Sequence, residues 1–96
     1  MAYVLSKFEV DDFDSWKAAF ETEEGAGFRK QAGQKSYQIF RSADDPKTVF
    51  MLVEWGDLAN ARRQAESAEL AEVHRQSGGG PLDTTFLEAA GSGTVD

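Results

Sequence analysis

The sequence has no cysteine and a single histidine, His74, among its 96 residues. Without thiols there is no disulfide, thiolate nucleophile, iron–sulfur ligation or sulfur-ligated zinc. One histidine without a His-X-X-X-His spacing also disfavours a protein-held transition metal, so we expect neither a metal nor a cofactor. No apolar run approaches the roughly 18–20 residues of a membrane-spanning helix, and no secretory signal is visible, so we expect a cytoplasmic protein without a membrane partner.

Basic residues are scarce as well. Ten Lys and Arg residues stand against 17 Asp and Glu, which gives a formal net charge of −7. A field of this sign repels phosphate backbones, so we expect no nucleic-acid partner. A chain of this length builds one thin core. We predict a single domain over residues 1–90 and a flexible tail over 91–96, where the sequence reads GSGTVD.

Periodicity and turn residues predict alternating strands and helices. The expected order is a strand over 3–10, a helix from Asp12, an irregular glycine-containing connection over 25–33, strands over 35–42 and 48–55, a helix from Asp57 to Gln76 with a kink near Ser67, and a strand over 82–90. This order predicts an α+β fold, the ferredoxin-like βαββαβ sandwich, with a four-stranded antiparallel sheet and two helices on one face. Phe13, Trp16 and Phe20 recur at helical spacing and are expected to pack in the core.

The register of the central hairpin follows if the loop 43–47 places Ser42 opposite Thr48. The resulting pairs, all on one face, are Phe40 with Phe50, Gln38 with Leu52, and Ser36 with Glu54. The other face carries the more continuous apolar set and is assigned to the helices; its members are Tyr37, Ile39, Arg41, Val49, Met51, Val53 and Trp55. A slip of one residue would exchange the two faces.

The strand TVFMLVEW, residues 48–55, is apolar on both of its faces. A one-sided antiparallel sheet alternates apolar with polar residues instead, and an uncovered apolar patch marks an interface. We therefore predict a homodimer that packs two helix-free faces together, with a pocket for a small hydrophobic or aromatic molecule between them. The predicted pocket lining is Ser36, Gln38, Phe40, Phe50 and Leu52.

Three segments resemble a known family: VDDFDSWKAAFE, the hairpin containing IFRSADDPKTVFMLVEW, and EWGDLANARRQAESAELAEVH. Over residues 3–88 the chain is similar to the antibiotic biosynthesis monooxygenase-like proteins of the dimeric α/β-barrel superfamily. The most specific element is Glu54-Trp55 followed some twenty residues later by His74. The resemblance implies a ferredoxin-like dimer, the dimeric α/β barrel. It leaves the activity open, because members include cofactor-independent oxygenases of aromatic polyketides, haem-degrading enzymes and proteins of unknown role.

The haem-degrading branch of the family is similar in placing a helix histidine where His74 stands. That branch pairs the histidine with an asparagine on the first strand and a tryptophan in the second helix, where this chain has Ser6-Lys7 and Gln64. The resemblance therefore favours the oxygenase branch. Its members are expected to deprotonate a phenol-like substrate and to let the carbanion react with dioxygen.

His74 and Glu54 are the candidate catalytic residues. Imidazole has an unperturbed pKa near neutrality, and a carboxylate becomes a base when burial raises its pKa. Each has a structural alternative: a cation near a helix C-terminus stabilises it by roughly 0.3–1 kcal/mol, and Glu54 can simply pair with a basic side chain. Trp55 is a candidate for stacking on an aromatic ligand or for core packing.

The sequence thus predicts a small-molecule-binding homodimer. The leading function is a cofactor-independent monooxygenase acting on an aromatic or polyketide-like substrate. The alternatives are a non-catalytic ligand-binding or stress-related dimer and a pure assembly module. An enzyme requires a partly polar cavity reached by His74 or Glu54, whereas an assembly module requires a dry interface.

Overall fold

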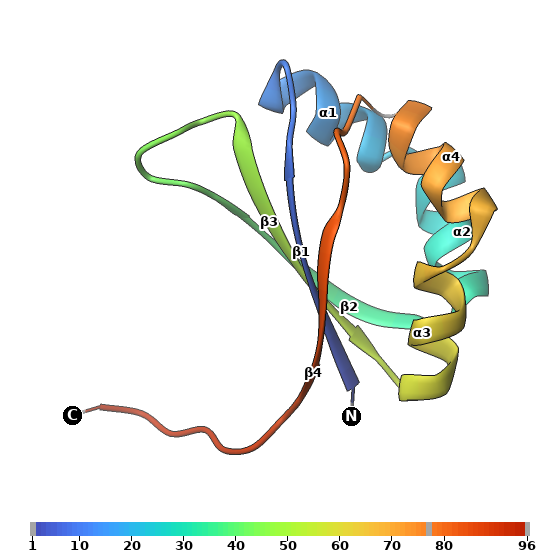
Figure 1. The fold of residues 1–96 in the computed structure, drawn as a ribbon, viewed down its shortest axis with the longest axis vertical. Coiled ribbons are helices and arrows are strands. Elements are labelled where there is room, and N and C mark those ends of the chain that lie inside the picture. The colour runs from blue at the N-terminus through green and yellow to red at the C-terminus, as the bar shows by residue number, and fades with distance from the viewer. Residues whose placement is uncertain (1, 77, 96) are drawn as a thin grey trace.

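A computed structural model describes the backbone of residues 2–76 and 78–95 and, within these ranges, all side chains except those of 28, 69, 70 and 73. The elements in chain order are β1 (Ala2–Glu9), α1 (Phe13–Phe20), α2 (Glu23–Ala32), β2 (Gln34–Arg41), β3 (Thr48–Trp55), α3 (Leu58–Ala65), α4 (Ala68–Gln76) and β4 (Asp83–Glu88). The strands form one antiparallel sheet in the order β2-β3-β1-β4. The helices all cover the same face of this sheet (Figure 1). The predicted ferredoxin-like sandwich is confirmed.

The first crossover holds two helices, so the prediction of an irregular connection over 25–33 is wrong. α2 begins at Thr22, whose hydroxyl accepts a hydrogen bond from the Gly25 N–H at 3.1 Å, and ends at Gly33 in the left-handed conformation with φ +99°. Two acidic residues in its first turn and two basic residues in its last turn suit the helix dipole. These end signals outweigh the glycines inside the helix, each of which costs roughly 1 kcal/mol relative to alanine.

The starts of α1 and α3 lie where the sequence places them, whereas α1 ends at Phe20 and not at the glycines that follow. Asp12 caps α1 by accepting a hydrogen bond from the Ser15 N–H at 3.3 Å, and Asp57 caps α3 by accepting one from the Ala59 N–H at 3.2 Å. The second crossover breaks between α3 and α4, which confirms the kink predicted near Ser67.

The hairpin of β2 and β3 has the predicted register. Phe40 lies opposite Phe50, Gln38 opposite Leu52 and Ser36 opposite Glu54. The set assigned to the helices faces them: Val49, Val53 and Trp55 are buried. The opposite side of the sheet, here called the open face, carries Tyr3, Leu5, Lys7, Ser36, Gln38, Phe40, Phe50, Leu52, Glu54, Thr85 and Leu87. Phe40 on this face is 52% exposed.

The core between sheet and helices consists of two clusters. One surrounds Trp55 and includes Val4, Val53 and Ala61. The other surrounds Trp16; its buried members are Phe8, Val10, Trp16 and Val49. Because Phe13 and Phe20 pack against the second cluster, the aromatic spacing of the first helix is the core stripe that the sequence predicts.

After β4 the chain runs away from the helices. Residues 89–95 form no regular element, and they leave the sheet on the side opposite the helical layer (Figure 1). The flexible tail over 91–96 stays a prediction, and Met1 and Asp96 lie outside the described residues. Within residues 2–76 and 78–95, every helix is too short or too polar to cross a membrane.

Candidate functional site

A cavity of about 390 Å³ lies between the sheet and the helical layer. Each strand and each helix contributes at least one residue to its lining. The volume lies within the roughly 300–1,000 Å³ of sites that enclose small molecules. The cavity is therefore on the helix side of the sheet, whereas the sequence analysis placed the pocket on the open face.

A row of rings runs along this side of the sheet. Neighbouring ring centroids lie 4.6 Å apart for His74 and Phe8, 5.1 Å for Phe8 and Trp16, 5.2 Å for Trp16 and Phe20, and 5.1 Å for Phe20 and Tyr37. We call these five residues the aromatic row. Three of them, His74, Trp16 and Phe20, line the cavity, so one edge of the cavity offers flat apolar surface to an aromatic ligand.

His74 stands at one end of the aromatic row, in the last turn of α4. Its Nε2 lies 2.8 Å from the Gly80 carbonyl oxygen. Since a carbonyl oxygen only accepts hydrogen bonds, Nε2 must carry the proton, and in the neutral ring the lone pair lies on Nδ1. Burial lowers the pKa of His74 below its ordinary value, and the bond to Gly80 opposes this only in part. The imidazole is therefore a neutral base near neutral pH.

Gly79 and Gly80 shape the place that holds the imidazole. A Cβ built on Gly79 would overlap the His74 ring. The Gly80 N–H donates to the Glu9 carbonyl oxygen at 2.8 Å, and Gly79 forms a β-bridge with Val10. The glycine run after α4 thus fixes the ring against the end of β1, in a space that only a residue without a side chain leaves free.

Replacing Gly79 with alanine should displace the His74 ring and break its bond to Gly80. The expected cost is roughly 1–3 kcal/mol of stability, as for other overpacked sites. Because His74 is the only histidine, ¹⁵N imidazole signals should report the loss of the Nε2–H form directly. Gly27→Ala is the matched control, since a Cβ there meets nothing within 4 Å. Ring signals unchanged by Gly79→Ala would contradict this description of the site.

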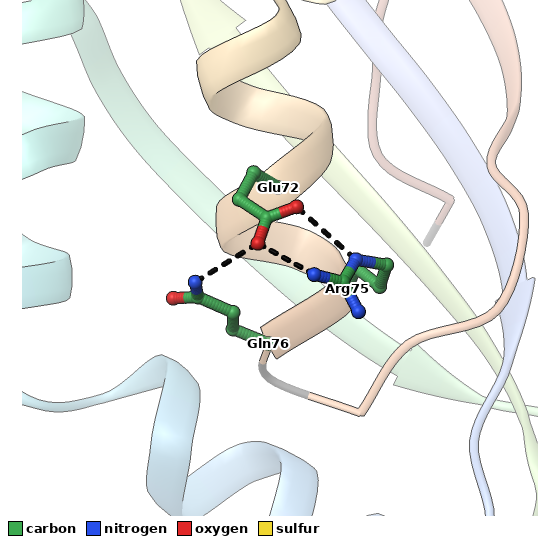
Figure 2. A network of polar contacts seen from close by, with 3 residues as sticks. All are labelled: Glu72, Arg75 and Gln76. Atoms are coloured by element: carbon green, nitrogen blue, oxygen red, sulfur yellow. Dashed lines mark hydrogen bonds and ion pairs between the residues drawn. The ribbon is translucent and has the colours of Figure 1, made fainter.

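The cation at the end of α4 is Arg75 and not His74. Figure 2 shows the Glu72 carboxylate accepting hydrogen bonds from Arg75 Nη2 at 2.6 Å, Arg75 Nε at 3.1 Å and Gln76 Nε2 at 3.1 Å. The Arg75 side chain is 72% exposed, so this ion pair adds little to stability. The charged side chain in the last turn of α4 is thus Arg75, and the contact of His74 at this helix end is its bond to the Gly80 carbonyl oxygen.

Arg29 of α2 lines the same cavity. Its Nη1 donates to the Phe20 carbonyl oxygen at 2.7 Å, and its guanidinium carbon lies 4.0 Å from the Phe20 ring centroid and 5.1 Å from that of Tyr37. His74 and Arg29 thus lie at opposite ends of the aromatic row. A proton acceptor and a fixed positive charge flank one aromatic surface.

The other predicted site residues lie together on the open face. Ser36, Gln38, Phe40, Phe50, Leu52 and Glu54 share that face, and none of them lines the cavity. The Ser36 hydroxyl donates to Glu54 Oε2 at 2.9 Å. Because His74 lies on the helix side, the structure does not bring Glu54 and His74 into one site.

The sequence analysis did not identify several residues that build the cavity. The sequence predicts Trp16 and Phe20 in the core, where they also lie, and Arg29 in an irregular connection. The caps of α2 at Thr22 and Gly33 were the available signal for Arg29. Among the residues that the structure describes, no group of three or more His, Cys, Asp and Glu side chains is arranged to hold a metal ion.

No family model matches the sequence, and no curated protein matches it. Solved structures do match the fold. SnoaB from Streptomyces nogalater, a cofactor-independent oxygenase, is 16% identical, with a TM-score of 0.71 over 95% of this chain and 94% of that one. The monooxygenase of ActVA-Orf6 from Streptomyces coelicolor, solved with nanaomycin D, is 22% identical, with a TM-score of 0.69 over 99% and 92%.

A third match, Rv0793 from Mycobacterium tuberculosis, is 17% identical, with a TM-score of 0.65 over 97% of this chain and 98% of that chain. At these identities the likeness shows the fold. The structural neighbours are antibiotic biosynthesis monooxygenases and related proteins, which agrees with the fold implied by the sequence resemblance.

Proposed function

We propose that this protein is a cofactor-independent monooxygenase that binds an aromatic or polyketide-like molecule in the cavity between sheet and helices. The observation that carries the proposal is the pairing of a neutral imidazole with an aromatic wall in a cavity of about 390 Å³. The shared fold with SnoaB and with the ActVA-Orf6 monooxygenase supports it. We place the ligand in this cavity and not on the open face, where the sequence predicts a pocket between two copies.

The proposed reaction uses His74 as the general base. Nδ1 takes the proton from a phenol-like substrate, and the resulting carbanion adds dioxygen to form a peroxide. Loss of water from the protonated peroxide leaves a carbonyl on the ring, so one oxygen atom enters the product and the other leaves as water. The substrate supplies all the electrons. The protein contributes orientation, exclusion of water and the base, and general-base catalysis of this kind is worth roughly 10²–10⁴-fold.

We propose that the open face forms the interface of a homodimer. Phe40 is half exposed there and Leu5, Phe50, Leu52 and Leu87 are only partly covered. In this arrangement Ser36, Gln38 and Glu54 supply polar contacts between the two copies, and the apolar members supply buried area.

A panel of phenols and naphthols tests the function. Thermal-shift measurements should find compounds that raise the melting temperature, and an oxygen electrode should then record dioxygen consumption with the best binder. Consumption of dioxygen in the absence of added metal, flavin or reductant is the expected result. Binding without any consumption across the panel would contradict the monooxygenase and favour the non-catalytic ligand-binding dimer.

A further inference from the structure

We infer that the cavity selects aromatic ligands that carry an anionic oxygen group, and that Arg29 binds this group. The inference rests on the proposed function, because it takes the cavity as the ligand site. To the proposed function it adds the chemical class of the ligand, an aromatic molecule with an anionic oxygen group, and a specificity-determining residue, Arg29.

The charge of Arg29 is not neutralised by a neighbouring carboxylate among the described residues. The side chain is half-buried, and among the residues that the structure describes it has no ion-pair partner. A guanidinium carries five N–H donors, and the Phe20 carbonyl oxygen takes one from Nη1. Contacts with two rings stabilise a cation but leave its in-plane donors unused. Donors therefore remain for an acceptor in the cavity.

Gly25, in the first turn of α2, leaves room for the guanidinium. A Cβ on Gly25 would lie 2.7 Å from the Phe20 carbonyl oxygen and 3.2 Å from Arg29 Nη1. At this position glycine is what allows the arginine to reach the Phe20 carbonyl, and so fixes where the cavity's positive charge lies.

The cavity walls carry more unpaired buried donors than acceptors among the described residues. Trp16 and Trp55 line the cavity, and the indole N–H of each is buried without an acceptor. A buried donor left without a partner costs roughly 1–3 kcal/mol. The Gln34 side-chain oxygen is the one buried acceptor without a partner among the described residues. Two indole donors and a guanidinium favour a ligand with oxygen acceptors over a hydrocarbon.

The remaining charges do not account for such a preference. Glu24 also lines the cavity, but it is exposed, and water and salt screen an exposed charge. The net charge of −7 repels anions as a whole. A preference for an anionic ligand would therefore have to come from a local cation, and Arg29 is the arginine or lysine in the cavity lining.

The experiment compares two ligands of nearly the same shape, 2-naphthoate and 2-naphthamide, by isothermal titration calorimetry. Arg29→Gln should weaken binding of 2-naphthoate by roughly tenfold or more, the worth of a charge-assisted hydrogen bond. It should leave 2-naphthamide within about twofold, because that ligand carries no charge to pair. The affinity of Arg29→Lys for 2-naphthoate should lie between those of wild type and Arg29→Gln. The matched control is Lys30→Gln, which removes an exposed charge from the same helix outside the cavity and should change neither affinity.

The outcomes separate the two claims. If both ligands bind wild-type protein and Arg29→Gln weakens them equally, or weakens neither, the inference is overturned while the cavity remains a ligand site. If neither ligand binds wild-type protein while naphthols of the panel do, the inference is overturned and the proposed function stands. If the naphthols also fail to bind, the proposed function fails and takes the inference with it.

Discussion

The His74→Gln variant should lose dioxygen consumption by roughly 10²–10⁴-fold, the usual contribution of a general base. Glutamine keeps an N–H that can donate to the Gly80 carbonyl oxygen, now bonded to Nε2 at 2.8 Å, but it has no basic lone pair. The fold around the glycine run should therefore persist while the proton acceptor is lost. Rates are measured with an oxygen electrode, using the best binder from the phenol panel at saturating concentration.

The pH dependence of the wild-type rate tests the role of His74 independently. Burial lowers the pKa of His74, so the reactive neutral ring persists to a pH below the ordinary range of histidine. The rate should hold as pH falls through about 6.5, the ordinary pKa of histidine, and decline only below it.

Ligand affinity within about threefold of wild type, together with an unchanged circular dichroism spectrum, would show that His74→Gln removed chemistry and not structure. A variant with wild-type turnover would reduce His74 to a structural residue.

Leu52→Glu should convert the proposed homodimer into monomers. Leu52 lies opposite Leu5 on one side and Gln38 on the other, in the middle of the open face. Two-fold packing of that face would bury one unpaired carboxylate from each copy, at a cost of several kcal/mol per charge. The dissociation constant of the dimer should rise by roughly a hundredfold or more. Analytical ultracentrifugation over nanomolar to micromolar protein concentration measures it.

Ala59→Glu is the control for the dimer experiment, because it adds the same charge at an exposed position of α3. This control should sediment as wild type does. Wild-type protein that sediments as a monomer at all concentrations would contradict the dimer. A dimer unaffected by Leu52→Glu would show that the copies associate through another surface.

The fold could be predicted from the sequence because each element carries local signals. Asp12 and Asp57 sit where helix caps belong, and the loop 43–47 sets the register that pairs Phe40 with Phe50. Alternation in β3 then separates the helix side from the open face, because side chains in a strand point alternately to the two faces of the sheet. These are short-range rules, and they hold here.

Glycine content alone argues against α2, whereas its two end signals predict it. Gly25 and Gly27 lie within the helix, and glycine lowers helix propensity wherever it occurs. Thr22 and Gly33 nevertheless form well-placed caps. Gly25 allows the close approach of Arg29 to Phe20, a tertiary contact that no local pattern contains.

The cavity itself could not be predicted for a related reason. Trp16 and Phe20 have the spacing of core residues whether they fill the core completely or border a space. The sequence gives the face on which a side chain lies, whereas a cavity depends on how far the helices stand from the sheet. The sequence analysis therefore placed a pocket where polar residues such as Ser36 and Glu54 interrupted an apolar face. That pocket, between two copies, stays a prediction, and the cavity of about 390 Å³ lies on the other face of the sheet.

The most direct measurement is an NMR titration of uniformly ¹⁵N-labelled protein with a bound naphthol. The indole N–H signals of the two tryptophans and the ring signals of His74 all come from residues that line the cavity. The ligand is predicted to shift these signals, with intermolecular NOEs to Phe20 and no change at the amides of Phe50 and Leu52. Shifts confined to those two amides and the rest of the open face, with the signals of both indoles and the imidazole unchanged, would contradict the proposal that the ligand binds in the cavity between sheet and helices.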